Sequence, residues 1–164
     1  MAAVYRAAIF LNTGEWRLAY DAALHTANLY PTESLVAAFA AFELGELEEA
    51  RARFRHATLN HPRGVGIVLG KRTPEPANTT EARDHNAGVT LVRSLSGYLS
   101  KRSTKTKRFF TGLWDDQEIS SLREEIMGAE RTMDGMRGPD YDQKEYRRLF
   151  DRLHSLRKSE PVRA

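Results

Sequence analysis

The alternation of apolar and polar residues predicts helices along most of this 164-residue chain. After residue 115, apolar residues three or four positions apart predict an antiparallel helical hairpin with a turn at residues 137–140. The two apolar stripes of this hairpin consist of Ile119, Leu122, Ile126, Ala129, Met133 and Met136, followed by Tyr146, Leu149, Phe150, Leu153 and Leu156. Stripes this narrow can pack on each other, on the rest of the chain, or on a second copy of the chain.

Residues 1–63 contain an internal repeat with an offset of 31 positions. The matched pairs are Gly14 with Gly45, Glu15 with Glu46, Trp16 with Leu47, Ala19 with Ala50, and Pro31 with Pro62. The glycine allows the positive φ that ends a first helix, and the alanine lets two helices cross closely. The proline cannot continue the second helix and closes the unit. The pattern therefore predicts two tandem helical hairpins.

Both units resemble tetratricopeptide repeats, and the second unit resembles them more closely. It matches the family pattern at Gly45, Leu47, Ala50, Phe54, Ala57 and Pro62. The first unit has Ala23 in place of the aromatic residue and Thr26 in place of the small one, and the period of 31 is shorter than the family's about 34. The resemblance implies an all-α fold of antiparallel hairpins, a short right-handed α-solenoid. It also implies a non-enzymatic adaptor module that binds a protein or peptide partner.

In this family the first helix of each unit lines a concave groove. The resemblance implies that the partner-binding residues are Leu11, Asn12, Leu35, Phe39, Phe42 and Glu43, with Val4 and Ala8 beside them. Such an apolar groove suits an amphipathic helix or an extended peptide. Two repeats leave little room for an open groove, however, so the chain's own helix 81–100 or its C-terminal hairpin is an alternative occupant.

The repeat pattern ends after Pro62. Residues 64–70 are expected to form a short helix or turn on the second hairpin, and residues 71–80 a connecting loop. A helix at 81–100 is expected to cap the repeats. The chain is therefore expected to comprise a repeat domain with its capping helix at 1–100, a basic and aromatic connector at 101–114, and the C-terminal hairpin at 115–160.

Positive charge is concentrated in the middle of the chain. Residues 64–110 carry nine Lys/Arg and three Asp/Glu, whereas the segments on either side are slightly acidic. The basic cluster consists of Lys101, Arg102, Lys105, Lys107 and Arg108, and Phe109, Phe110 and Trp114 follow it. Basic residues beside aromatic ones are typical of phosphate contact and base stacking, so nucleic-acid binding is the alternative function. The competing interpretation is a solvated loop whose aromatic residues belong to the core.

Patterns that would indicate catalysis or a ligand are weak. The spacing of Gly64, Gly66 and Gly70 does not fit a dinucleotide- or phosphate-binding loop, so we interpret these as turn glycines. Only His56 and His61 approach metal-ligand spacing, and a helix end is expected between them. We therefore expect no catalytic residue, no metal and no cofactor.

The composition favours a soluble globular protein, with 41% hydrophobic and 29% charged residues. Cysteine is absent, which excludes disulfides and cysteine ligands. No apolar run approaches the roughly 20 residues of a membrane span. The first residues also lack the pattern of a signal peptide, so we expect a cytoplasmic protein with no membrane partner. The apolar stripes of the C-terminal hairpin also allow a homo-oligomer through this hairpin.

Overall fold

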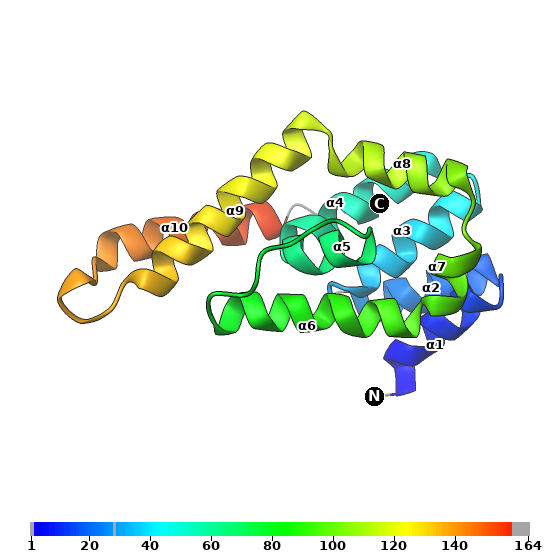
Figure 1. The fold of residues 1–164 in the computed structure, drawn as a ribbon, viewed down its shortest axis with the longest axis horizontal. Coiled ribbons are helices and arrows are strands. Elements are labelled where there is room, and N and C mark those ends of the chain that lie inside the picture. Colours follow the sequence, from blue (N-terminus) through cyan, green and yellow to red (C-terminus); the bar gives the residue numbers. More distant parts are fainter. Residues whose placement is uncertain (1, 28, 159–164) are drawn as a thin grey trace.

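The computed structural model describes residues 2–27 and 29–158, apart from the side chains of residues 2–5, so the side chain of Val4 lies outside the description. The described residues form an all-α fold without strands (Figure 1). The elements are α1 Ala2–Asn12, α2 Trp16–Ala27, α3 Glu33–Glu43, α4 Leu47–Asn60, α5 Pro62–Val68, α6 Thr79–Ser94, α7 Ser96–Lys101, α8 Thr104–Trp114, α9 Gln117–Gly135, the 3-10 turn η1 Gly138–Asp140, and α10 Gln143–Arg157.

The first four helices form two hairpins whose turns have the same backbone geometry. Gly14 and Gly45 have φ values of 81° and 78°, in the left-handed region that favours glycine. In both turns the amide after the glycine donates to the carbonyl oxygen five residues upstream over 2.9 Å. The repeat read from the sequence is therefore present as a structural repeat at the predicted offset.

Helix α3 lies at the centre of this part of the fold. Every residue from Glu33 to Phe42 is buried, and α1, α2 and α4 pack around it. Four of these residues are alanines, and their small side chains allow neighbouring helices to approach closely. Ala19 of α2 and Ala50 of α4, the repeat-equivalent alanines, are also fully buried.

Helices α5 and α6 add a third hairpin, which the broken repeat pattern did not reveal. They cross so closely that a Cβ atom on Gly88 would lie 2.7 Å from the Cα of Gly64. Gly66 is likewise helical, and a Cβ there would lie 3.0 Å from the Trp114 ring. Only Gly70, with φ of 73°, fits the interpretation of turn glycines. That interpretation is wrong for Gly64 and Gly66. Because these glycines have no side chain, α6 and the Trp114 ring can pack closely against α5.

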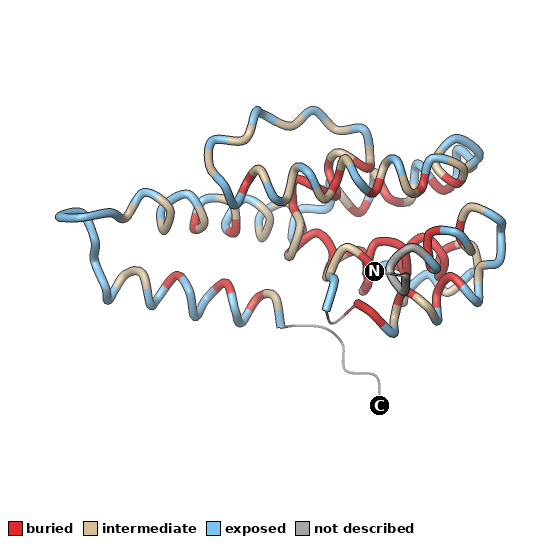
Figure 2. Tube along the Cα trace, turned by 90° about the horizontal axis from the view of Figure 1, so that it is seen from below, coloured by how far each residue is buried: buried red, intermediate tan, exposed pale blue. Residues whose placement is uncertain are grey.

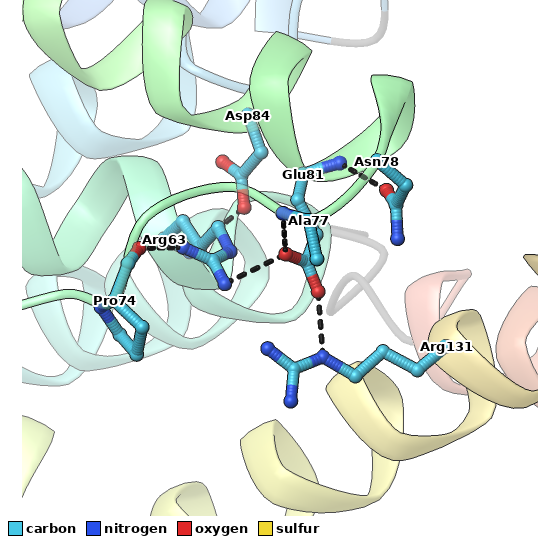
Figure 3. Close-up of polar contacts among 7 residues, drawn as sticks. All are labelled: Arg63, Pro74, Ala77, Asn78, Glu81, Asp84 and Arg131. Atoms are coloured by element: carbon cyan, nitrogen blue, oxygen red, sulfur yellow. Dashed lines mark hydrogen bonds and ion pairs between the residues drawn. The ribbon is translucent and has the colours of Figure 1, made fainter.

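A buried carboxylate joins this third hairpin to α9 (Figure 3). Glu81 accepts hydrogen bonds from Arg63 over 2.8 Å, from Arg131 over 2.7 Å and from the Ala77 amide over 2.8 Å. Burial alone would raise the pKa of Glu81, but these hydrogen bonds and the two positive charges hold it below its ordinary value. Asp84, one turn later, accepts from the first amides of α5 over 2.8 and 2.9 Å.

Helices α9 and α10 form the predicted C-terminal hairpin, which projects from the body as an arm (Figures 1 and 2). Asp116 caps the start of α9, and the turn between the helices includes Gly138 with φ of 55°. The arm has its own apolar cluster, to which Leu59 of α4 contributes from the body. None of the described helices has the length and apolar character needed to cross a membrane.

Glu33, at the start of α3, gives a testable pH dependence. It is only 1% exposed, its Oε2 has no hydrogen-bond partner among the described residues, and burial raises its pKa from 4.5 to about 7. The folded protein therefore favours the protonated carboxyl. Its contribution to stability is full below pH about 4.5 and is lost as the pH rises through about 7.

We expect Glu33→Gln to leave the free energy of unfolding nearly unchanged at pH 4.5 and to raise it at pH 8, by up to about 3 kcal/mol. Urea unfolding of both proteins at the two pH values measures this difference. The exposed Glu48→Gln serves as control and is expected to show no such change. An equal difference between wild type and Glu33→Gln at both pH values would contradict the prediction.

Candidate functional site

The concave face of the two repeats is covered by the chain itself. Leu11, Leu35 and Phe39 are fully buried, and Phe42 is 9% exposed. Phe39 and Phe42 are covered by α7 and α8, which follow the third hairpin. Two occupants of the groove were considered from the sequence. The predicted helix 81–100 is divided at Leu95 into α6 and α7, and α7 lies here together with α8. The C-terminal hairpin does not cover this face.

Phe110 of α8 is the main side chain in this covering contact. Its ring centroid lies 4.8 Å from that of Phe39 and 5.6 Å from those of Phe42 and Phe54, and the side chain is fully buried. Tyr98 of α7 packs on Phe39 at 5.2 Å. Burying a phenylalanine contributes about 1.5–3 kcal/mol, and each favourable aromatic pair adds about 0.5–1.5 kcal/mol. This contact therefore holds α8 firmly on the repeats.

The polar residues expected in the groove also bind the covering segment. Asn12 donates to the carbonyl oxygen of Ser94 over 2.7 Å and accepts from the Tyr98 amide over 2.9 Å, where α6 ends and α7 begins. Glu43 accepts from the Tyr98 hydroxyl over 3.0 Å and from the Thr106 hydroxyl over 3.2 Å. Burial, followed by the charge and hydrogen bond of Glu43, raises the pKa of Tyr98 well above its ordinary value.

One end of the concave face remains open as a cavity of about 390 Å³ between α1 and α7. Trp16, Glu43, Lys101 and Arg102 are among the residues that line it.

The basic cluster belongs mainly to α8 and is solvent-facing. Lys101, Lys105, Lys107 and Arg108 are exposed, and none of them forms an ion pair with a described residue. Arg102 is half-buried, and burial lowers its pKa. The structure therefore brings four exposed positive charges together along α7 and α8.

The aromatic residues that follow the cluster are engaged in the protein. Phe110 is in the core, and the ring of Phe109 packs on Phe42 at 4.8 Å. The guanidinium of Arg123 lies 3.7 Å from the ring centroid of Trp114. These rings are not arranged as a platform on which bases could stack. The competing interpretation is therefore confirmed for the aromatic residues, but its loop is wrong, because residues 104–114 form helix α8.

The arm carries a second concave surface. A cleft of about 520 Å³ opens between α9 and α10, next to the start of α6. Met133 of α9 and Met136, which directly follows α9, line it together with Tyr146, Phe150 and Leu153 of α10. Phe150 is 54% exposed, although it lies in the middle of a helix, and its ring stacks on His154 at 6.3 Å. Apolar side chains at the mouth of a cleft are typical of a protein-binding surface.

The rim of this cleft is charged. Arg157 pairs with Glu130 across the hairpin and donates to the carbonyl oxygen of Leu59 over 3.1 Å. Asp134 and Arg137, 3.6 Å apart, close the outer end of the cleft. An apolar floor surrounded by ion pairs resembles the centre and rim of a protein–protein interface.

Within the described residues there is no group of three or more His, Asp or Glu side chains placed to hold a metal ion. Comparisons with known protein families, with curated proteins and with solved structures found no match. The geometry of the chain itself is therefore the basis for assigning a site.

Sequence reasoning did not identify the arm cleft, although a signal for it was present. Leu149 and Phe150 are adjacent apolar residues, and one helix face cannot bury both. The structure buries Leu149 between the helices and leaves Phe150 at the surface, where it marks the cleft.

Proposed function

We propose that this chain is a non-enzymatic protein-binding module of the tetratricopeptide-repeat type that contacts its partner through the arm. The observation that carries the proposal is the exposed Phe150 at a cleft of about 520 Å³ that has apolar side chains on its floor and charged ones on its rim. Large aromatic side chains at partly open apolar pockets are frequent anchors of binding energy. The 31-residue structural repeat in α1–α4 supports the family likeness.

In this proposal the repeats act as a scaffold. Leu11, Leu35, Phe39 and Phe42 are all buried, and the rings of Phe39 and Phe42 pack under α7 and α8. A peptide could reach these residues only if α8 left its place, at the cost of exposing Phe110. The arm needs no such change, because its cleft is already open.

The arm is also held in a defined position relative to the scaffold. Arg131 of α9 pairs with the buried Glu81, and Glu118 pairs with Arg55 of α4 over 3.2 Å. At the other end of the hairpin, Arg157 bonds to the backbone of Leu59. A partner would therefore meet a preformed surface and would not have to order it, which favours affinity.

Photo-crosslinking tests the proposal in the organism's own cells. When p-benzoylphenylalanine replaces Phe150, we expect a discrete covalent adduct with a protein partner. The control places the same group at Leu18 of α2, which is 48% exposed and lies on the body. We expect no such adduct there, and we expect Phe150→Glu to weaken partner capture by about tenfold or more. Identical adducts at both positions, or none at position 150, would contradict the proposal.

A second candidate function is electrostatic binding of nucleic acid along α7 and α8. The specific observation in its favour is the set of four exposed positive charges, at positions 101, 105, 107 and 108, that have no carboxylate partner among the described residues. Because the neighbouring rings are packed in the protein, this binding would rest on phosphate contacts and would be independent of base sequence.

Titration with single- and double-stranded oligonucleotides at two salt concentrations tests this candidate. With about four phosphate contacts, raising the salt from about 50 to about 200 mM should weaken binding roughly 100-fold. The variant replaces Lys101, Lys105, Lys107 and Arg108 with Gln and is expected to lose binding. A control that removes Lys144 and Arg147 of α10 should bind as wild type. Binding without salt dependence, or equal loss in both variants, would rule the candidate out.

A further inference from the structure

On the cleft side of the arm, a protruding side chain lies next to a hollow that could receive such a side chain. Phe150 stands out from α10, and the hollow beside it is lined by Met133 of α9 and by Met136, which directly follows α9. Methionine side chains adapt their shape and make favourable contacts with aromatic rings. A surface that carries both a knob and a hole is complementary to itself. Self-complementarity is the requirement for an interface that two identical chains form around a two-fold axis.

The two helices of the arm also have opposite charges. Helix α9 contains five acidic and two basic residues, and α10 contains five basic and two acidic residues. Within one chain this complementarity is used in ion pairs such as Arg152 with Glu125, 2.7 Å apart. A two-fold axis running along the arm would place α9 of one copy beside α10 of another, antiparallel, so the same attraction would act between chains.

The arm on its own is also incompletely packed. Its apolar cluster consists of residues from two helices, with Leu59 as the contribution from the body. Phe150 and Tyr141, both about half exposed, lie outside that cluster. Two hairpins face to face would form a four-helix bundle, which buries such side chains and is a common solution for amphipathic helix pairs.

From these observations we propose that the partner in the arm cleft is a second copy of this chain, so that the arms of two copies form an antiparallel four-helix bundle. The proposal rests on the proposed function, because it names the partner of the same surface. Phe150 of each copy inserts between α9 and α10 of the other. The two bodies, with their basic α8 helices, lie outside the bundle.

The test is the molar mass of the purified full chain in solution, measured by light scattering after size-exclusion chromatography over a range of loading concentrations. We expect a species of twice the 18.6 kDa chain mass that dissociates on dilution. Phe150→Glu is expected to weaken dimerisation by about tenfold or more, because it places a charge in an apolar pocket. Leu18→Glu, at a similarly exposed apolar position on the body, is expected to dimerise as wild type. Far-UV circular dichroism verifies that both variants stay helical.

The outcomes separate this inference from the proposed function. A chain that is monomeric at every concentration, or a dimer that Phe150→Glu leaves unchanged, would overturn the inference. If a monomer still forms an adduct with a different protein through position 150, the proposed function stands and the second copy is excluded. If neither a dimer nor any adduct through position 150 is found, both proposals fail. A dimer lost only in Phe150→Glu supports the inference.

Discussion

The packing of Phe110 against Phe39, Phe42 and Phe54 is the contact on which the rest of this structure depends. Two helical repeats cannot bury the apolar face that they share, so something has to cover it. Here the chain supplies its own cover. Helix α8 brings one fully buried phenylalanine onto three aromatic residues of α3 and α4, and α7 adds Tyr98. The consequence is that this face is covered, apart from the cavity between α1 and α7.

To place α7 and α8 on the repeats, the chain has to run back across them and then continue into the arm. The third hairpin, formed by α5 and α6, makes this path possible. The close contact of Gly64 with Gly88 sets α6 tightly against α5, so that α6 ends beside Asn12 of α1. After α8 the chain turns into the arm, which Arg131 ties back to the buried Glu81. A buried charge stays in place only when it is paired, so this carboxylate fixes α9 relative to the body. The main surface that is open to a partner therefore lies on the arm and not on the repeats.

Much of the fold was predictable from local patterns. The two repeat hairpins and the C-terminal hairpin follow from glycine, alanine and proline at fixed offsets and from apolar residues at helical spacing. Helix α8 was harder to recognise, because lysines and arginines dominate its first half. Its buried stripe of Thr106, Phe110 and Leu113 has helical spacing, and Ser103 caps it, so a weaker signal was present.

The candidate sites could not be predicted in the same way, because they depend on contacts that the spacing of residues along the sequence does not reveal. The resemblance predicts which residues line a concave face, but whether such a face is open depends on contacts between positions some 70 residues apart, such as Phe39 and Phe110. The same applies to Glu81, whose partners lie 18 and 50 residues away. Long-range pairing of this kind follows from the tertiary packing, and a single sequence gives no direct signal of it. The arm cleft was not predicted, because Phe150, the exposed residue beside it, looks like a core residue in the sequence.

The central claim is that α8 closes the concave face permanently, and amide hydrogen exchange of the unmodified chain tests it most directly. If the claim is right, the hydrogen-bonded amides of α8 exchange as slowly as those of the core helix α3, and more than about 100-fold more slowly than the loop at 71–78, because opening α8 exposes the aromatic core. If α8 instead exchanges as fast as that loop while α3 stays protected, the face opens readily. The repeats would then be the binding surface, and permanent closure by α8 would be contradicted.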